Sequence, residues 1–174
     1  MKKNVFLILF VLLALIVTGS IVLKKSKTSF REKAQIGLPA PDFELQDING
    51  KKWRLRDLKD KIVILNFWAS WCSDCKEEKK SIQAYLNKNG NSDDLVFITV
   101  LYKDNPITVS EMAKKEGFSF PVLIDDGVIS TIYGIKGVPE TFLIDKKGVL
   151  RHKIVGPVDW SNPHIVPHLK KVLS

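Results

Sequence analysis

The amino-acid sequence predicts an α/β domain in which a mixed sheet carries helices on both faces. Apolar runs of strand length alternate along the chain with stretches that have helical periodicity. The last two apolar runs are joined directly by a short turn, which indicates an antiparallel pair at the end of the domain. With 174 residues, of which 45% are hydrophobic, the chain can bury a core of its own. Such alternation of elements is typical of a mixed sheet with helices packed on it.

The N-terminal part predicts a membrane anchor. Residues 4–23 are uncharged and apolar, with about the twenty residues that a bilayer crossing requires. No small-residue cleavage site follows, and the apolar run resumes at 21–23 after a short polar break. We therefore expect an uncleaved signal-anchor over 1–23 that contacts membrane lipid through residues 4–23. A cleaved signal peptide, which the two-lysine start and the modest apolar length would suit, is the alternative. Residues 24–36 are polar and lack apolar periodicity, which predicts a tether before a globular domain at 37–174.

The net charge of +8 is concentrated around that apolar segment. Residues 1–33 hold seven of the 27 Lys and Arg residues but one of the 19 acidic residues. The domain is therefore close to neutral, and no basic face for nucleic acid is expected. More lysines come after the apolar segment than before it, so the positive-inside count alone would keep the domain in the cytoplasm. A short basic start before an apolar run nevertheless resembles a signal-anchor that exports the rest of the chain, so we expect an extracytoplasmic domain.

The first half of the domain contains a hairpin signal and two buried strands. Asn49-Gly50 lies between two alternating stretches, and both residue types tolerate the positive φ of a tight turn. The runs "KIVILNF" (61–67) and "DLVFITVLY" (94–102) are continuously apolar, which predicts strands buried on both faces.

Between those two strands, residues 73–88 have the pattern of a helix. Ile82, Tyr85 and Leu86 would form its apolar face, with Lys76, Glu77, Lys79 and Lys80 on the solvent side.

The second half continues the alternation. Thr108 lies three residues before Glu111, which is a capping-box pattern for a helix that Gly117 would end. "FPVLIDDG" (120–127) predicts a strand, and a short helical turn should come after it, through Ile132. Residues 137–156 then predict two strands joined at the Lys146-Lys147-Gly148 turn. A final helix over 162–173 should be shortened at its start by Pro167.

Cys72 and Cys75 are the only cysteines, and three kinds of site compete for them. A bond across four residues would stabilise the fold by only about 2 kcal/mol in the chain-entropy model, so a structural staple is a poor explanation. Structural zinc needs four ligands, whereas the histidines, at positions 152, 164 and 168, lie near the C-terminus. Copper(I) held by two thiolates stays open as an alternative. The remaining interpretation is a redox-active dithiol.

The surroundings of the two cysteines favour redox chemistry. Cys72 is expected where a buried strand ends and a helix begins, so unpaired backbone N–H groups and the helix dipole would stabilise its thiolate. We therefore expect Cys72 to be the nucleophile and Cys75, one turn into the helix, to be the more buried resolving thiol. Asp74 puts a negative charge beside both sulfurs, which disfavours a thiolate and makes the couple more reducing.

Glu78 is the second acid with a predicted role. It lies three residues after Cys75 and would share its helix face, where it could take the proton of the Cys75 thiol. A solvated Glu78 within "KEEKK" is the alternative.

The string "NFWASWCSDCKEE", with "APDFELQDINGKKWRLRDLKDKIVILNF" before it and "YGIKGVPETFLIDKKGVL" after it, resembles a known family. These are the membrane-tethered, thioredoxin-like thiol-disulfide reductases of the ResA, CcmG (DsbE) and TlpA type. The resemblance extends over residues 37–155 and implies a thioredoxin fold with an added N-terminal β-hairpin.

The resemblance also implies site residues. Pro139 in "GVPET" matches the family's cis-proline beside the sulfurs, with Val138 and Glu140 as neighbouring substrate contacts. Glu78 matches an acidic position near the buried cysteine, and thioredoxins proper carry a buried Asp where this chain has Asn66. Trp71, next to the nucleophile, is expected to be a partly exposed substrate contact, whereas Trp68 is expected in the core. The chain departs from the family at Asp74, because relatives usually have proline there.

For function, the resemblance implies an extracytoplasmic reductant of protein disulfides that needs no cofactor. The expected substrate is the oxidised C-x-x-C-H haem-attachment motif of an apocytochrome c, and the expected electron donor is a membrane thiol protein. Two alternatives remain. One is a copper(I)-binding factor, or a disulfide reductant, for an oxidase copper centre. The other is a peroxiredoxin, which would need a Thr or Ser at position 69 and a Pro at position 65, where this chain has Ala69 and Leu65.

Overall fold

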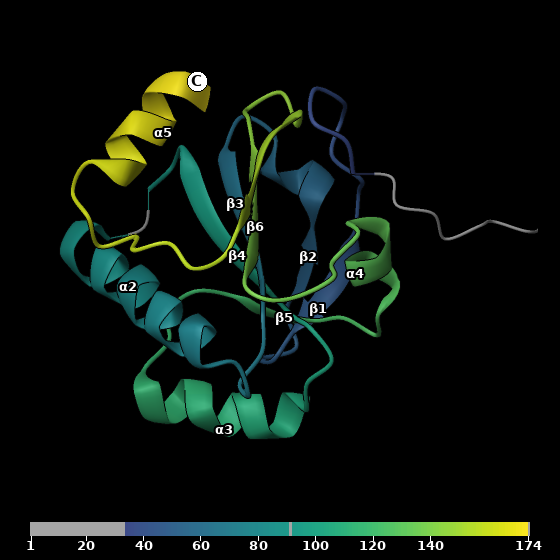
Figure 1. Cartoon of the computed structure of the whole chain (residues 1–174), viewed down its shortest axis with the longest axis vertical. Coiled ribbons are helices and arrows are strands. Elements are labelled where there is room, and N and C mark those ends of the chain that lie inside the picture. Colours follow the sequence, from purple (N-terminus) through teal and green to yellow (C-terminus); the bar gives the residue numbers. More distant parts are fainter. Residues whose placement is uncertain (1–33, 91, 174) are drawn as a thin grey trace, which may run out of the picture. The chain divides into compact units, whose positions relative to one another are not determined.

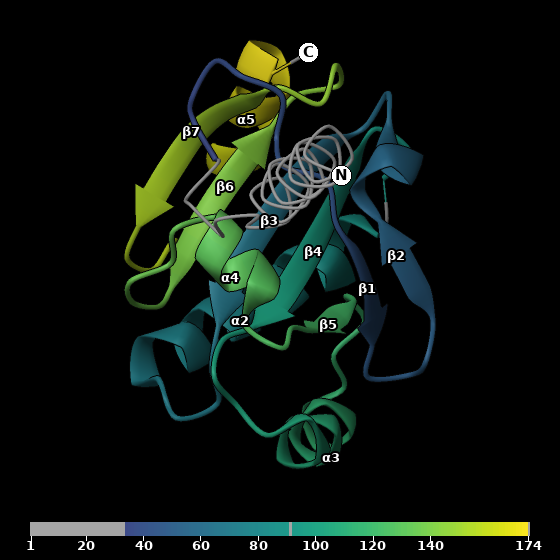
Figure 2. The same cartoon turned by 90° about the vertical axis from the view of Figure 1, so that its right-hand side faces the viewer.

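The protein is described by a computed structural model that covers residues 34–90 and 92–173. Seven strands form one sheet (Figures 1 and 2). They are β1 (Glu44–Asp47), β2 (Lys52–Arg54), β3 (Ile62–Trp68), β4 (Leu95–Leu101), β5 (Val122–Ile124), β6 (Glu140–Ile144) and β7 (Leu150–Val155). Their spatial order is β2-β1-β5-β4-β3-β6-β7. The mixed sheet predicted from the sequence is therefore confirmed.

The predicted anchor at 1–23 and residues 24–33 of the predicted tether lie outside the described residues. Within 34–90 and 92–173, no helix has both the length and the apolar character needed to cross a membrane. The chain already contacts the domain at Ala34, whose N–H donates to the Ile132 carbonyl oxygen at 3.3 Å. Among the described residues, contacts with the domain are thus present before the predicted boundary at Gly37.

Three adjacent strands inside the sheet, β4, β3 and β6, have the most extensive pairing. β3 is buried at every position, and it pairs in parallel with β4 and antiparallel with β6. The two continuous apolar runs are explained by this position, because a central strand covered on both faces has no solvent-facing side chains. β3 ends at Trp68, and the cysteine loop begins directly after it.

The two predicted hairpins form the two edges of the sheet. β1 and β2 pair antiparallel, and Gly50 has the positive φ of 85° that the turn requires. The carboxylate of Asp47 accepts hydrogen bonds from the Asn49 and Lys51 N–H groups, which fixes the turn. β6 and β7 pair antiparallel across the turn that contains Gly148, where φ is 77°.

Helices cover both faces of the sheet, as the alternation predicted (Figure 1). They are α2 (Ser73–Asn89), α3 (Pro106–Glu116), α4 (Val128–Ile132) and α5 (Ile165–Leu173), with the 3-10 helix η1 (Leu55–Leu58). Side chains of α2, α3 and α5 belong to one buried apolar cluster with Trp68 and Trp160. Side chains of α4 and η1 belong to the cluster on the opposite face, around Phe67 and Tyr133.

The start of α3 differs from the prediction. Asn105, rather than Thr108, caps the helix, and its Oδ1 accepts a hydrogen bond from the Ile107 N–H at 2.9 Å. Pro106 occupies the first helical position, where its fixed φ suits a helix and its missing N–H costs no hydrogen bond. The capping-box prediction is therefore wrong. Gly117 does end the helix, with a φ of 68° in the left-handed region.

Candidate redox-active site

The two cysteines lie at the start of α2 and form a disulfide. Their Cα atoms are 5.3 Å apart. Cys72 is the N-cap residue, and its Sγ accepts a hydrogen bond from the Cys75 N–H at 3.1 Å. This N–H is one of the helix-start donors that lack a partner within the helix. Cys75 is fully buried, whereas Cys72 keeps 9% of its surface exposed. Cys75 is thus the more buried of the two cysteines, as the sequence predicted.

Residues of the loop that follows β4 form hydrogen bonds with the loop that precedes Cys72. The Asp104 carboxylate accepts hydrogen bonds from both the N–H and the hydroxyl of Ser70. The Trp71 Nε1–H donates to the Lys103 carbonyl oxygen at 3.2 Å. Because β3 and β4 are parallel neighbours, their carboxyl ends meet at one edge of the sheet, and the two loops meet there as well.

A third segment reaches the disulfide from the end that precedes β6. The peptide bond between Val138 and Pro139 is cis. The Val138 carbonyl oxygen lies 3.6 Å from the Cys72 Sγ. Pro139 and Val138 are therefore placed beside the outer sulfur, at the position that the family resemblance implied.

The predicted substrate contacts are placed differently from one another. Trp71 is 61% exposed beside Cys72, so its ring is available at the surface. Trp68 is fully buried, as expected for a core residue. Glu140 is only 4% exposed, and its carboxylate forms an ion pair with the Lys153 ammonium at 2.8 Å. The Glu140 carboxylate is thus paired within the domain, whereas the Trp71 ring is exposed to solvent.

Glu78 is buried one turn after Cys75, with 2% of its surface exposed. Its Oε1 accepts hydrogen bonds from the Val158 N–H at 3.2 Å and from the Trp160 Nε1–H at 3.0 Å. Its Oε2 accepts one from the Asn66 Nδ2–H at 2.9 Å. A solvated Glu78, the alternative in the sequence analysis, is therefore excluded. These donors are of the kind that stabilise a carboxylate inside a protein.

Lys79 is a residue of this region for which the sequence-based expectation is wrong. The charge pattern places it on the solvent side of the helix, but it is fully buried. Its Nζ donates to the Asn66 Oδ1 and lies 3.6 Å from the Glu78 Oε2. The ammonium also lies 5.4 Å from the centre of the Trp68 ring, within cation–π range. The covering of this helix face by β3 and by the segment before α5 is a tertiary effect that the local charge pattern does not reveal.

Burial lowers the pKa of Lys79 to about 8, because the charged ammonium loses its hydration, while the nearby Glu78 carboxylate opposes that shift. A sequence signal for Lys79 did exist. It lies four residues after Cys75, as Glu78 lies three after it, and both spacings place a side chain on the Cys75 face of a helix. Asn66 joins the two charges, because its amide donates to Glu78 and accepts from Lys79.

Ser73 and Asp74 lie between the cysteines in the first turn of α2, and both are exposed. A negative charge at this position interacts favourably with the helix dipole. The same charge opposes a thiolate on either neighbouring sulfur. Asp74 is therefore available to influence the redox couple without being part of the buried cluster.

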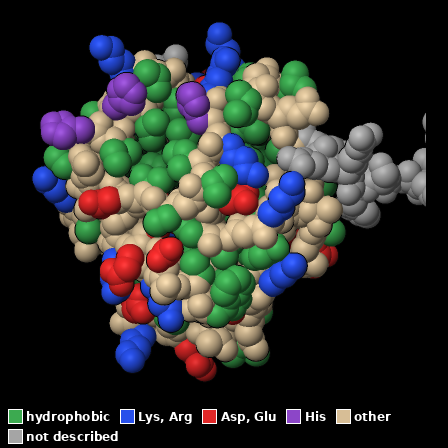
Figure 3. Space-filling model, viewed as in Figure 1, with side chains coloured by type: hydrophobic (Ala, Val, Ile, Leu, Met, Phe, Trp, Pro, Cys, Tyr) green, Lys and Arg blue, Asp and Glu red, His purple; other side chains and the backbone are tan. Residues whose placement is uncertain are grey.

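The described residues bear on the zinc and peroxidase alternatives, whereas copper(I) held by the two thiolates would need no further ligand. In 34–90 and 92–173, no group of three or more His, Cys, Asp or Glu side chains is arranged to hold a metal ion. The three histidines are exposed, and Figure 3 shows them as purple side chains towards the upper edge of that face. Ala69 and Leu65 are buried and apolar, so neither supplies the hydroxyl or the proline that a peroxidatic site requires.

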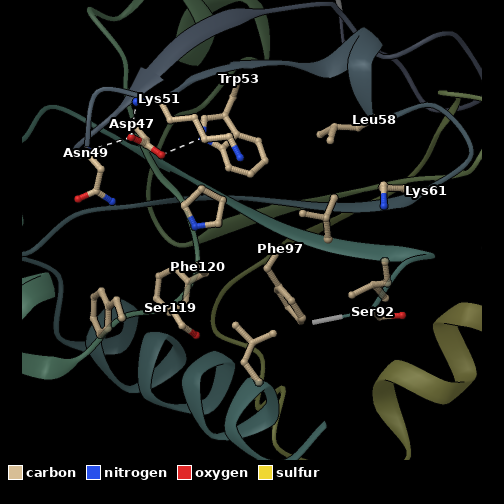
Figure 4. A pocket seen from close by; sticks show the side chains of 15 residues that line it. Asp47, Asn49, Lys51, Trp53, Leu58, Lys61, Ser92, Phe97, Ser119 and Phe120 are labelled. Carbon is tan, nitrogen blue, oxygen red and sulfur yellow. Dashed lines mark hydrogen bonds between the residues drawn. The ribbon is translucent and has the colours of Figure 1, made fainter. Parts of the chain in front are cut away.

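Two surface pockets differ in their relation to the disulfide. One, with a cavity volume of about 910 Å³, is lined by Lys103, Asp104 and Ile107 and therefore adjoins the loop that holds Trp71. The other, of about 420 Å³, lies between the N-terminal hairpin and α2 (Figure 4). It contains neither cysteine, and its labelled residues include Asp47 and Trp53, which hydrogen-bond to each other at 2.9 Å. The first pocket is not lined by a cysteine either, but it includes Lys103 and Asp104, which bond to Trp71 and Ser70 in the cysteine loop.

Comparison with protein families matches residues 36–153 to the AhpC/TSA family. Among curated proteins, the thiol-disulfide oxidoreductase ResA of Bacillus thuringiensis is 36% identical over 176 aligned residues. The alignment covers 99% of this chain and 99% of that protein.

Two solved structures show the same fold. The exposed lipoprotein thioredoxin Etrx1 of Streptococcus pneumoniae is 34% identical, with a TM-score of 0.63 over 75% of this chain and 99% of that chain. A protein described as a putative thiol:disulfide interchange protein DsbE from Chlorobium tepidum is 27% identical, with a TM-score of 0.66 over 82% of this chain and 100% of that chain. The thioredoxin-like fold implied by the sequence is thereby confirmed.

Proposed function

The chain belongs to the AhpC/TSA family, as a thiol-disulfide oxidoreductase of the ResA type, and from this premise we propose that it reduces the haem-attachment disulfide of apocytochromes c outside the cytoplasm. The observation that carries the proposal is the arrangement at the start of α2. The outer cysteine, Cys72, is 9% exposed and follows the exposed Trp71, and the fully buried Cys75 lies one turn before the buried Glu78 carboxylate.

The reaction uses the dithiol form of the pair. The Cys72 thiolate attacks one sulfur of the substrate disulfide, which forms a mixed disulfide and releases the other substrate sulfur as a thiolate. Cys75 then loses its proton and attacks the Cys72 sulfur, and the remaining substrate sulfur leaves as a thiolate. Two electrons have passed to the substrate, and Cys72 and Cys75 are left as the disulfide seen in the structure.

Glu78 is the proposed acceptor of the Cys75 proton. It is the acid placed one turn after Cys75 on the same helix, and it is shielded from solvent. A buried thiol needs such a base, because its proton cannot pass directly to bulk water. The leaving substrate thiolate is protonated from solvent.

The proposed substrate surface surrounds Cys72. Trp71 offers an exposed ring, the Val138 carbonyl oxygen lies beside the sulfur, and the pocket at Lys103 and Asp104 extends the surface. A peptide with an exposed disulfide can approach from this side only, since Cys75 is fully buried. The extracytoplasmic location and the membrane thiol donor rest on the apolar segment at 4–23, which would hold the domain at the membrane.

A trapping experiment tests this mechanism. Full-length Cys75→Ser protein, reduced and mixed with a synthetic oxidised C-x-x-C-H peptide, should accumulate a covalent adduct through Cys72. Full-length Cys72→Ser protein is the matched control and should accumulate none. Absence of an adduct with Cys75→Ser would contradict the assignment of Cys72 as the nucleophile.

The substrate is tested in the cell. Deletion of the gene should abolish holocytochromes c, and an added small thiol should restore them. Loss of oxidase activity with cytochromes c intact would instead support the copper-centre alternative and overturn the apocytochrome proposal.

A further inference from the structure

We propose that Lys79 is a positioning residue of the dithiol, and that its buried ammonium keeps the Glu78 carboxylate ready to accept the Cys75 proton. The inference rests on the proposed role of Glu78 and adds a residue that the local sequence pattern placed in solvent. The observation behind it is a buried polar cluster of Lys79, Glu78 and Asn66 directly after Cys75 in α2 and beneath it in β3.

The placement of Lys79 differs from that of an ordinary helix lysine. A lysine in α2 could extend into solvent, as Lys80 does with 62% of its side chain exposed. Lys79 instead has no exposed side-chain surface. A buried ammonium is costly unless it is paired and hydrogen-bonded, and Lys79 has both kinds of contact. Its partners therefore hold it in one position.

The groups that face the ammonium come from two elements. Glu78 in α2 supplies the negative charge at 3.6 Å, while Asn66 and Trp68 in β3 supply a carbonyl oxygen and a ring face. Within the described residues, Glu78 is the acid that pairs with Lys79. The converse also holds, so removal of Lys79 leaves the buried carboxylate without its cation.

That pairing has a consequence for the reaction. A buried carboxylate with no cation nearby takes up a proton more readily, and once protonated it cannot accept the Cys75 proton. Lys79 should therefore matter in the second step, when Cys75 attacks, and more at low pH than at high pH. It should matter little in the first step, because the Cys72 thiolate is stabilised by N–H groups at the start of α2, where the Cys75 N–H donates to its sulfur.

The two steps can be measured separately in the full-length protein with the oxidised C-x-x-C-H peptide. Adduct formation in a Cys75→Ser background reports on Cys72. Release of reduced peptide in a single turnover with both cysteines present reports on Cys75. We expect Lys79→Met to slow the second step about tenfold at pH 6 and by a smaller factor at higher pH. The first step should change less than about twofold, which is within the range of the weakest charge-pair effects.

Matched variants identify which idea fails. Lys80→Met removes the neighbouring exposed lysine and should leave both steps unchanged. Glu78→Gln should slow the second step by itself, and adding Lys79→Met to it should cause little further loss because the two residues act as a unit. If Glu78→Gln has no effect, the proposed role of Glu78 fails. If Glu78→Gln slows the step but Lys79→Met leaves its pH profile unchanged, only the inference about Lys79 fails.

A folding defect in Lys79→Met would not leave the question open. Lys79→Gln retains a donor for Asn66 and Glu78 without the charge, and it should show the same pH-dependent loss. If neither variant folds, NMR of labelled lysine side chains in the wild-type protein decides. One lysine should titrate well below the 10.5 of an exposed lysine and should move lower still in Glu78→Gln. A Lys79 titration that stays the same in Glu78→Gln would show that the ammonium and the carboxylate do not interact, and it would overturn the inference.

Discussion

At the residue scale, Asp74 is the charged residue between the two cysteines. It is exposed in the first turn of α2 and belongs to no buried cluster. Its charge opposes the thiolates of the reduced form, so it stabilises the disulfide relative to the dithiol. The presence of an acid here should make the protein a stronger reductant than a neutral residue would.

Asp74→Asn should therefore raise the reduction potential. A neutral side chain removes the repulsion of a thiolate at an exposed site, an effect of about 0.2–1 kcal/mol, or ~5–20 mV for two electrons. Equilibration with glutathione buffers, followed by separation of the oxidised and reduced forms, measures the change. Glu77→Gln, an exposed acid of the same helix, is the control and should change the potential less. A lower potential in Asp74→Asn would show that Asp74 acts by another route.

The sequence revealed some residues of the site and not others. The C-x-x-C spacing identified Cys72 and Cys75, and helical spacing indicated Glu78 as a partner of Cys75. Lys79 has that spacing too, but its charged neighbours Glu77 and Lys80 are typical of a solvated face. Burial of Lys79 depends on Asn66 and on the helix packing against β3, which are far from it in sequence.

At the scale of elements, the loop after β4 fixes the loop that precedes α2. The Asp104 carboxylate accepts from both donors of Ser70, and the Lys103 carbonyl oxygen accepts from the Trp71 ring. Lys103 itself has a positive φ of 49°, which is uncommon for a residue with a side chain. These bonds hold Cys72 at the end of the sheet.

Asp104→Ala should loosen this connection. The partly buried Ser70 N–H would lose a charged acceptor, so we expect a loss of about 1.5–3 kcal/mol in the free energy of unfolding. The Trp71 ring should also become more mobile, which fluorescence anisotropy can measure beside urea unfolding. Asp93→Ala changes an exposed acid at the other end of β4 and should have little effect. Equal stability of the two variants would contradict the proposed support of the cysteine loop.

Most helices and strands were predictable from the sequence, and the wrong prediction was the start of α3. The runs that became β3 and β4 are long, apolar and covered on both faces, so their pattern has few competing interpretations. For α3, two start signals competed. Asn105 with Pro106 directly after it prevailed over Thr108, because proline is suited to the first helical position and an Asn before it caps well.

At the scale of the whole molecule, the buried Lys79 should affect how stability depends on pH. Its pKa is about 8 in the folded protein, lowered by burial, and 10.5 when exposed. Between these values the unfolded chain holds a proton that the folded protein has lost. The free energy of unfolding should therefore rise with pH in this window, by at most about 1.4 kcal/mol per pH unit.

Urea unfolding of the oxidised full-length protein at pH 7.5 to 9.5 tests this linkage. The contribution of Lys79 is isolated by comparison with Lys79→Met. In this variant the free energy of unfolding should not show that rise with pH, because a methionine side chain does not titrate. Lys80→Met should keep it, because that lysine is exposed and its pKa is raised by a hydrogen bond with Glu77. Parallel curves for wild type and Lys79→Met would show that Lys79 keeps an ordinary affinity for its proton.

The order of the strands was less predictable than their existence. β5 lies between β1 and β4, so the N-terminal hairpin joins the sheet through a strand that comes much later in the sequence. Nothing in the local pattern of 44–54 indicates this partner. Register with β5 arises only where Gln46 and Asp47 meet Ile124 and Leu123 in the folded sheet.

The buried cluster beneath the disulfide also affects how the protein matures. Its bonds join residues far apart in the chain, with Asn66 and Thr141 separated by 75 positions and Glu78 and Trp160 by 82. Contacts of such long range form late in folding. The two cysteines are thus exposed to oxidants before these long-range hydrogen bonds have formed. Because the chain has only these two, oxidation within a nascent molecule can produce one pairing alone, and no isomerase is needed to correct it.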